Sequence, residues 1–286
     1  MVWHITKDVE EFLDAAGGFL RARPVENTVL LTVAENKRLR GLDPHSAEAR
    51  GVDGYGAEAA VFGWREGGDA AFLRTPPRAA LISAMPPEAA AELAGVLADR
   101  GLPGVDGPDA AVAAFAAEWH RLTGASGQVR RRHRLYRLDS LAPPTPPARG
   151  SARRATARDR DLLIDWMTTF SRDIGEDAIE AEDFVDDKLA HSGVLLWEVD
   201  GRPVSMASET RAQAGMVRIQ AVYTPAEHRS HGYAGAVTTA LSRAALDAGA
   251  AHVVLFTDLA NPTSNALYQR LGYVPLEDRS MVEFNA

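Results

Sequence analysis

The sequence predicts an α/β fold with two tandem domains, in which a mixed central β-sheet is flanked by helices. The first observation is length, because 286 residues are more than one domain of about 100–200 residues usually holds. The second is a proline-rich stretch at 142–150, since proline lacks a backbone donor and favours an extended connector. The third is the alternation of short apolar strands with helical patterns on both sides of that stretch. We therefore expect domains at 1–141 and 151–286.

The segment 151–286 has the clearer pattern. Leu162, Leu163, Trp166, Met167 and Phe170 recur at helical spacing. Strands are expected before and after a long central helix, and such a crossover predicts a mixed sheet with helices on its faces. The expected helices are 159–172, 181–190, 232–248 and 263–271, and the expected strands are 194–199, 204–211, 216–224, 252–257 and a short final one at 281–284.

The segment 1–141 follows a similar order. A helix is expected at 9–22, strands at 57–64, 70–74 and 79–84, an alanine-rich helix from Pro86 to Arg100, a helix at 108–122 and a strand at 131–138. The connection into the alanine-rich helix lacks both arginine and glycine. We interpret this half as a degenerate copy of the C-terminal domain, without catalysis and without a cradle for an anion.

Composition excludes several classes of function. The formal net charge of -8 disfavours a non-specific nucleic-acid binder, which needs a basic surface. The absence of cysteine excludes thiol nucleophiles, disulfides and cysteine-based metal sites. The histidines show no metal-ligand spacing, so no metal is expected. The longest apolar stretch, 110–117, is short of the roughly 20 residues that span a bilayer, and no secretory signal pattern opens the chain, so we expect no membrane contact and a cytoplasmic protein.

The turn at 229–235 has the composition of a phosphate-binding helix entrance. It reads Arg229-Ser230-His231-Gly232-Tyr233-Ala234-Gly235, between an expected strand and the long helix. Small residues let the backbone approach a ligand closely, and the free amides and dipole of a helix N-terminus suit a pyrophosphate. An arginine adds a charge-assisted contact. Alone, this string is also typical of an ordinary surface loop.

Two other nucleotide-binding motifs do not fit. A P-loop requires Gly-Lys before a serine or threonine, and the chain has no Gly-Lys pair. A dinucleotide fold requires G-x-G-x-x-G with an acidic residue on the next strand, which is also absent.

A second motif narrows the interpretation. After the next expected strand the chain reads Asn261-Pro262-Thr263-Ser264-Asn265-Ala266-Leu267-Tyr268-Gln269-Arg270-Leu271-Gly272-Tyr273. Together with the 229–235 turn, it resembles the GNAT acetyltransferases, whose [QR]-x-x-G-x-[GA] motif follows the fourth strand and whose L-Y-x-x-x-G-[FY] helix follows the fifth. The resemblance covers about the last 135 residues.

The resemblance implies roles for individual residues. Acetyl-CoA is the implied co-substrate. The backbone around Val222 and Thr224 would run beside its pantetheine arm, the turn would hold the pyrophosphate, and Tyr268 would protonate the departing thiolate. The implied cofactor-binding residues are Val222, Tyr223, Thr224, Arg229, Ser230, His231, Gly232, Tyr233, Ala234, Gly235, Asn261 and Ser264. Tyr268 could instead be core packing of its helix.

The general base is less defined. An ammonium with a pKa near 10.4 must lose a proton before it attacks. Many relatives carry a glutamate on the fourth strand, but the strand at 216–224 offers only Gln220 there. Glu209 on the preceding strand is the best substitute, acting directly or through a water, and a solvated strand carboxylate is the alternative.

An acidic segment precedes the first sheet strands of this half. In GNAT folds the first two helices cover the acceptor pocket, so negative charge there would attract a cationic amine. A solvated helix face is the competing interpretation. The acidic residues are Asp173, Glu176, Asp177, Glu180, Glu182, Asp183, Asp186 and Asp187.

These observations predict an acetyl-CoA-dependent N-acetyltransferase that acts on a primary amine of a small molecule, possibly cationic, by direct attack in a ternary complex. The alternatives are a CoA-binding regulatory or scaffold protein without catalysis, and an acetyltransferase of protein lysines or N-termini. The identity of the acceptor and the oligomeric state are open.

Overall fold

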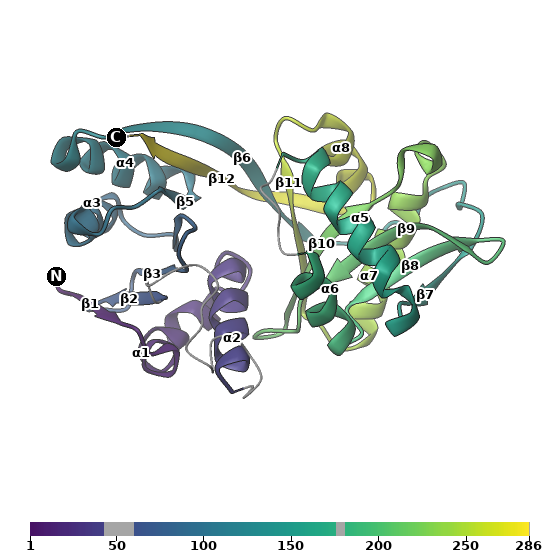
Figure 1. Cartoon of the computed structure of the whole chain (residues 1–286), viewed down its shortest axis with the longest axis horizontal. Coiled ribbons are helices and arrows are strands. Elements are labelled where there is room, and N and C mark those ends of the chain that lie inside the picture. Colours follow the sequence, from purple (N-terminus) through teal and green to yellow (C-terminus); the bar gives the residue numbers. More distant parts are fainter. Residues whose placement is uncertain (43–59, 176–180, 286) are drawn as a thin grey trace. The chain divides into compact units, whose positions relative to one another are not determined.

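A computed structural model describes residues 1–42, 60–175 and 181–285 (Figure 1). The chain forms two compact units. Unit 1 comprises Met1–Leu135, Asp258–Ala260 and Leu276–Ala286, and unit 2 comprises Tyr136–Thr257 and Asn261–Pro275. The class is α/β with mixed sheets, as the sequence predicts.

Unit 1 has a mixed sheet in the order β1-β2-β3-β4-β5-β12-β6. Among its pairs, β4 and β5 run parallel, and β5 and β12 run antiparallel. Its elements are β1 (Trp3–Thr6), α1 (Val9–Ala22), α2 (Thr28–Leu42), β2 (Val61–Arg65), β3 (Ala71–Arg74), β4 (Ala80–Ile82), α3 (Pro87–Leu97), η1 (Ala98–Arg100), β5 (Gly104–Pro108), α4 (Asp109–Thr123), β6 (Ser126–Leu138) and β12 (Tyr273–Asn285).

Two apolar clusters hold unit 1 together. One packs α1 and α2 against β2 and β3 around Phe12, Leu30 and Phe62. The other packs α3 and α4 against the sheet around Leu93 and Phe115. Burial of such side chains contributes about 1.5–3 kcal/mol each. The helix at 9–22 is confirmed; α2, β1 and β5 were not predicted.

Unit 2 has its strands in the order β7-β8-β9-β10-β11, of which β10 and β11 are parallel and the other pairs antiparallel. Its elements are β7 (Ser151–Arg154), η2 (Ala157–Asp159), α5 (Arg160–Asp173), α6 (Ala181–Ala190), β8 (Val194–Val199), β9 (Arg202–Glu209), β10 (Met216–Tyr223), η3 (Ala226–His228), α7 (Tyr233–Asp247), β11 (His252–Asp258) and α8 (Pro262–Arg270). Every predicted helix and strand from 159 to 271 is present within a few residues.

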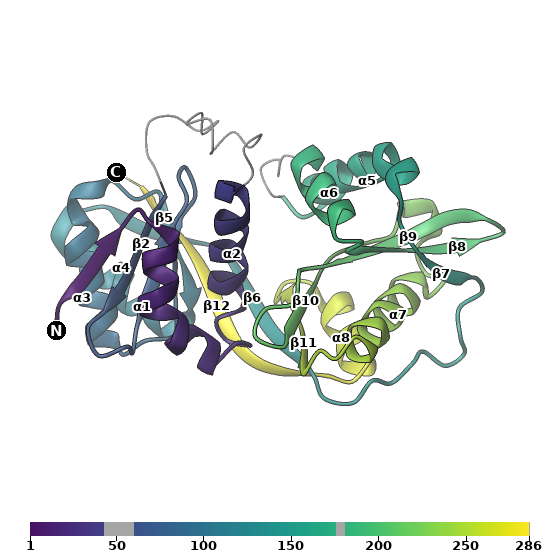
Figure 2. The same cartoon turned by 90° about the horizontal axis from the view of Figure 1, so that it is seen from below.

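Helices cover both faces of the unit 2 sheet (Figure 2). The side chains of α5 and α6 pack on one face with Leu196, Met206 and Tyr223, and we call this the α5/α6 face. The other face packs against α7 and α8 through Ile219 and Leu255, and we call it the α7/α8 face. Strand residues alternate between these faces because successive side chains of a strand point in opposite directions.

Strands β6 and β12 contribute residues to both units, which the sequence did not indicate. The predicted short strand at 281–284 is wrong in its extent, because β12 begins at Tyr273 and pairs with β5 from Arg279 to Glu283. Three stretches therefore differ from the predicted domains at 1–141 and 151–286: residues 136–141 lie in unit 2, and residues 258–260 and 276–286 lie in unit 1. The predicted linker 142–150 also lies in unit 2.

The proline-rich stretch 142–150 packs along unit 2. The Ala142 N–H donates to the Leu271 carbonyl over 3.0 Å, and the Arg149 carbonyl accepts from Trp197 Nε1 at 2.9 Å. Pro144 lies so close to Gly235 that a Cβ there would stand 3.3 Å from the proline Cγ. Residues 142–150, which the prolines predict as a connector, thus pack against unit 2.

None of the helices in residues 1–42, 60–175 and 181–285 combines the length and the apolar character needed to cross a membrane.

Candidate active site

The site predicted from the sequence lies where β10 and β11 part. Their parallel register runs from Met216, opposite His252, to Ile219, opposite Leu255. Both strands continue beyond this stretch, β10 to Tyr223 and β11 to Asp258. The ends of two parallel strands that separate in this way form a crevice at the carboxyl edge of the sheet, where α/β proteins commonly bind ligands.

A bulge in β10 shapes this region. The register with β9 shifts between Gln220 and Tyr223, and Ala221 has φ 48°, which is unusual for a residue with a Cβ. Two serines of β9 hold the bulged backbone: Ser205 Oγ donates to the Tyr223 carbonyl and Ser208 Oγ to the Gln220 carbonyl, both over 2.9 Å. The shift places Val222 on the α7/α8 face and Tyr223 on the α5/α6 face.

The predicted phosphate turn leads into α7, and no side chain caps the first amides of this helix. Helix α7 begins at Tyr233, and Gly232 is its N-cap with φ 79°, a left-handed conformation that glycine adopts without strain. A glycine cap provides no side-chain acceptor, and the first turn carries no acidic residue. The amides of Tyr233, Ala234 and Gly235 and the helix dipole are therefore available to an anion.

Arg229 adds the expected positive charge, but it already has an acidic partner. Its Nη2 lies 2.7 Å from Asp173 Oδ2, and its Nε donates to the Thr224 carbonyl over 3.1 Å. Asp173 is the last residue of α5, so the acidic segment touches the phosphate turn. Both side chains of the ion pair are about half exposed, which keeps the pair open to exchange.

Among the remaining turn residues, His231 and Tyr233 stack on each other. Ser230 has φ 65°, and the His231 ring lies stacked on Tyr233, with its Nδ1 2.7 Å from the Arg229 carbonyl oxygen. Tyr223 lies edge-on to two aromatic rings of α5, and burial, followed by the charge of Asp173, raises its pKa. Residues 222–235 are thus brought together as the sequence predicts.

Asn261 and Ser264 interact with each other. Asn261 is the N-cap of α8, and its Oδ1 accepts the Ser264 N–H over 3.0 Å. This capping bond occupies one acceptor and stabilises the start of the helix by about 1 kcal/mol. The cofactor contact that the resemblance implies would use the remaining polar groups of the two residues.

Tyr268 lies on α8 within the apolar cluster of the α7/α8 face, 8 % exposed, with its ring edge-on to Tyr273 at 6.1 Å between centroids. Burial raises the pKa of Tyr268 to about 12. Its hydroxyl has no hydrogen-bond partner among the described residues. Its oxygen is not among the fully buried polar atoms that lack a partner, so the hydroxyl is accessible to a ligand.

Glu209 ends β9 opposite Ile219 of β10, which places it on the α7/α8 face with Tyr268. Its Oε1 accepts from Arg154 Nη1 at 2.8 Å. Its Oε2 is buried without a hydrogen-bond partner among the described residues. One oxygen of this carboxylate is thus neutralised by a cation, and the other is free to take a proton.

The acidic segment is largely neutralised by cations. Asp173 pairs with Arg229, Asp186 and Glu182 pair with Arg160, and Asp187 pairs with Arg211. Glu176, Asp177 and Glu180 lie outside the described residues. Four of the five described acids thus share three arginines, so the described part of the segment carries less unpaired negative charge than its sequence suggests.

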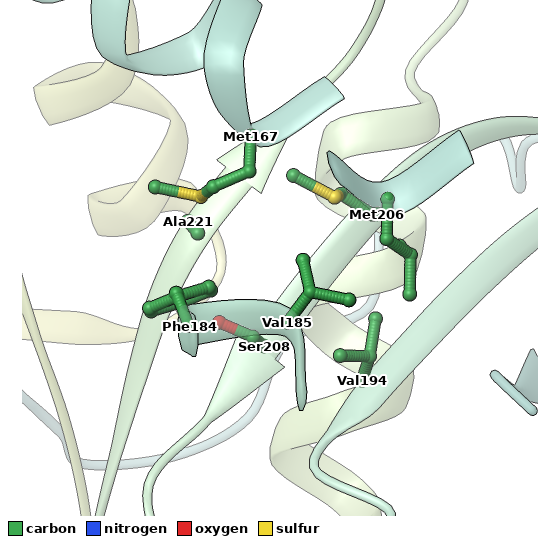
Figure 3. A pocket seen from close by; sticks show the side chains of 8 residues that line it. Met167, Phe184, Val185, Val194, Met206, Ser208 and Ala221 are labelled. Carbon is green, nitrogen blue, oxygen red and sulfur yellow. The ribbon is translucent and has the colours of Figure 1, made fainter. Parts of the chain in front are cut away.

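A small apolar cavity lies under α5 and α6 (Figure 3). Ala221 of the β10 bulge lines it, so it reaches the point where the strands part. Ser208 supplies the only hydroxyl among its lining side chains. The other lining residues are Leu163, Met167, Phe184, Val185, Val194 and Met206.

Sequence reasoning missed the serines of β9 and Lys188 of α6. Lys188 is 4 % exposed although it lies in an acidic helix. The sequence does indicate this burial, because Lys188 follows Phe184 by four residues and Val185 by three. This spacing places the three side chains on one helix face.

The chain resembles known proteins at two levels. Residues 160–273 match the family model described as the acetyltransferase (GNAT) family. Among solved structures, a Drosophila protein matches with a TM-score of 0.67, 14 % identity and coverage of 99 % of this chain and 98 % of its own. No match was found among curated protein sequences.

Two bacterial structures also span nearly the whole chain. An acetyltransferase of the GNAT family from Colwellia psychrerythraea has a TM-score of 0.60, 10 % identity and 99 % coverage of both chains. A GCN5-related N-acetyltransferase from Sphaerobacter thermophilus has a TM-score of 0.60, 16 % identity and coverage of 98 % and 94 %. At these identities the structures establish the fold. Residues 160–273 are thus similar to the GNAT acetyltransferase family model, and this match and the shared fold support acetyl transfer in general.

Proposed function

We propose that unit 2 is an N-acetyltransferase that moves the acetyl group of acetyl-CoA to a primary amine of a small molecule by direct attack in a ternary complex. The observation that carries the proposal is the uncapped entrance of α7 beside the parted strands, together with the unpartnered hydroxyl of Tyr268. The first arrangement suits a pyrophosphate, and the second suits a leaving thiolate.

The phosphate turn would bind the cofactor by exchange of partners. The amides of Tyr233, Ala234 and Gly235 offer hydrogen bonds without any competing side chain. Arg229 would leave Asp173 for the pyrophosphate, whose two negative charges exceed the single charge of the carboxylate and which accepts in the same geometry. The bulged backbone at Val222 would lie beside the pantetheine arm.

Tyr268 would hold the proton that the thiolate needs. With a pKa of about 12 it is protonated throughout the physiological range. Acetyl transfer breaks the carbonyl carbon–sulfur bond and leaves negative charge on sulfur. A hydrogen bond from the Tyr268 hydroxyl to that sulfur stabilises the transition state. General acid catalysis of this kind contributes roughly 10²–10⁴-fold to the rate.

Glu209 is our candidate for the general base. Its buried Oε2 lacks a partner among the described residues, and its position opposite Ile219 lies next to the bulge. We propose that this oxygen takes the ammonium proton through a water. Gln220, at the position where many relatives carry glutamate, cannot take that proton.

The experiment is CoA-thiol release on addition of a panel of amines, with Tyr268→Phe as the test variant. We expect kcat to fall by at least tenfold while the Kd of acetyl-CoA changes less than threefold, since the lost proton matters in the transition state. The matched control is Tyr136→Phe, which removes a hydroxyl that hydrogen-bonds to Asn265 and Gln269 of α8. Turnover of Tyr268→Phe within twofold of wild type would assign the ring to packing alone.

The two alternatives give different results. Tight acetyl-CoA binding without thiol release for any amine would favour a regulatory or scaffold protein. Release with a lysine peptide but with no small amine would favour protein acetylation.

A further inference from the structure

The apolar cavity under α5 and α6 is lined by eight described residues of unit 2, and none of the eight is charged. Ser208 brings the one hydroxyl among them, and its Oγ already donates to the Gln220 carbonyl over 2.9 Å. Met167 reaches the cavity from α5, Val185 from α6 and Met206 from β9 (Figure 3). The cavity thus offers an occupant apolar contacts and almost no hydrogen bonding.

The size of the cavity points to a small occupant. Its volume is about 10 Å³, which is about the space that one water needs. A buried water also needs about two to four polar partners, and Ser208 is the single polar side chain in this lining. A methyl or methylene group has a similar size and needs no such partner, so it fits the lining better than a water does.

The cavity lies across the sheet from the groups assigned to the cofactor. Ala221 lines it at the bulge of β10, next to the point where β10 and β11 part. Val222 and Tyr268 belong to the opposite, α7/α8 face. A molecule that reaches the parted strands from the α5/α6 face would therefore place its amine at the crevice and the rest of its chain beside the cavity.

The acids of α5 and α6 do not line the cavity. Asp173 at the end of α5 pairs with Arg229, and Asp186 of α6 pairs with Arg160, both over 2.7 Å. A second ammonium on the acceptor would lose its hydration in the cavity and would find no carboxylate among the lining residues. Transfer of an isolated charge into apolar surroundings is costly, so the cavity selects against an acceptor with two ammonium groups.

We propose that the acceptor is a monoamine with a short apolar chain, and that a methyl or methylene group of this chain occupies the cavity. The inference rests on the proposed function and names its substrate class. The chain is held by contacts with Met167, Val185 and Met206, while the amine stands at the bulge of β10. The two methionines adjust to the occupant, because their side chains are unbranched and flexible.

The first test measures kcat/KM of CoA-thiol release for the linear amines from ethylamine to hexylamine and for 1,3-diaminopropane. One methylene in an apolar pocket changes kcat/KM by about 10–200-fold, so we expect a rise of at least tenfold at one step of the series and a fall after it. 1,3-Diaminopropane has the same number of non-hydrogen atoms as butylamine but ends in an ammonium. Its kcat/KM should be at least tenfold lower than that of butylamine.

The second test enlarges the cavity. Met206→Ala removes three side-chain atoms from the lining, so the optimum of the series should move to an amine about one to three carbons longer, with the Kd of acetyl-CoA within twofold. Val194→Ala, a smaller truncation in the lining, should move the optimum in the same direction and serves if Met206→Ala does not fold. Val217→Ala is the matched control and should leave the optimum unchanged, because Val217 is a buried strand residue of the α7/α8 face, outside the cavity.

The competing occupant of the cavity is the acyl group of the cofactor. If Met206→Ala gains turnover with propionyl-CoA while its amine optimum stays in place, the acyl group occupies the cavity and the inference is overturned. Equal kcat/KM for butylamine and 1,3-diaminopropane would overturn it as well. Absence of thiol release with every amine would instead reject the proposed function. Calorimetry of N-butylacetamide and N-(3-aminopropyl)acetamide would then still test the cavity without turnover, and equal Kd values for the two amides would overturn the inference.

Discussion

Replacement of Asp159 by asparagine tests how the first helix of unit 2 is anchored. Both Asp159 oxygens accept from Arg153 of β7 at 2.8 Å, and Oδ2 also accepts the Thr156 N–H at 2.8 Å. These bonds join β7 to the start of α5, whose Leu163 and Met167 line the cavity. The anchor therefore supports the acceptor side of the proposed active site.

The expected magnitude follows from the pKa. The hydrogen bonds from Arg153 have the largest effect on the pKa of Asp159, and they lower it. Burial acts in the opposite direction, and the hydrogen bonds from Thr156 lower the pKa further, from an ordinary 3.8 to about 2. This difference corresponds to about 2 kcal/mol of stabilisation at neutral pH. Because the folded-state pKa is depressed, the stabilisation is complete above about pH 5 and is lost as pH falls toward 2, with about half remaining at pH 3.

The assay is urea unfolding followed by the fluorescence of Trp166 and Trp197, compared at pH 7 and pH 3. We expect Asp159→Asn to lower the free energy of unfolding by about 2 kcal/mol at pH 7 and by about half of that at pH 3. Asp161→Asn, an exposed acid in the first turn of α5, is the control and should change it by less than about 0.5 kcal/mol. A difference below about 0.5 kcal/mol for Asp159→Asn, or one independent of pH, would refute the reasoning.

Three further predictions concern the cofactor. Gly232→Glu should abolish acetyl-CoA binding in calorimetry, whereas Gly232→Asn, which tolerates a positive φ without charge, should retain most of it; equal affinities would remove the turn from the site. Asp173→Asn frees Arg229 and should tighten acetyl-CoA binding by up to about fivefold, an effect that fades at high salt; weaker binding would mean that the ion pair positions the arginine. Binding stoichiometry should be one acetyl-CoA per chain, because α3 of unit 1 enters through Pro86 and Pro87, which lack amide donors; a second tight site would contradict this.

The motifs at 229–235 and 261–273 predict the candidate site from the order of residues. Residues 222–235 form a strand end, a turn and a helix entrance, and each depends on neighbours in the chain. Gly232 supplies the left-handed N-cap and leaves the amides of α7 uncapped, and both are local properties of a glycine-containing turn. For the same reason the helix and strand bounds of unit 2 were predicted closely.

The partners of charged side chains could not be predicted in this way. The acidic segment predicted an attractive surface for cations, but arginines from α5, from the stretch after β9 and from the phosphate turn pair with four of its five described members. Such pairs join residues distant in sequence, such as Arg229 and Asp173, and no periodicity encodes them. The burial of Lys188 has the same origin.

The sequence by itself determined the α/β class, the order of elements from α5 to α8 and the turn chemistry that suits a pyrophosphate. These follow from periodicity, capping and backbone freedom, which act over a few residues. Tertiary structure alone decided that β12 runs from unit 2 into the sheet of unit 1, that Tyr268 keeps an unpartnered hydroxyl among the described residues, and that an apolar cavity lies under α5 and α6. Each of these depends on which distant segments share a strand pair or a buried face, and that is settled only when the apolar surfaces pack together.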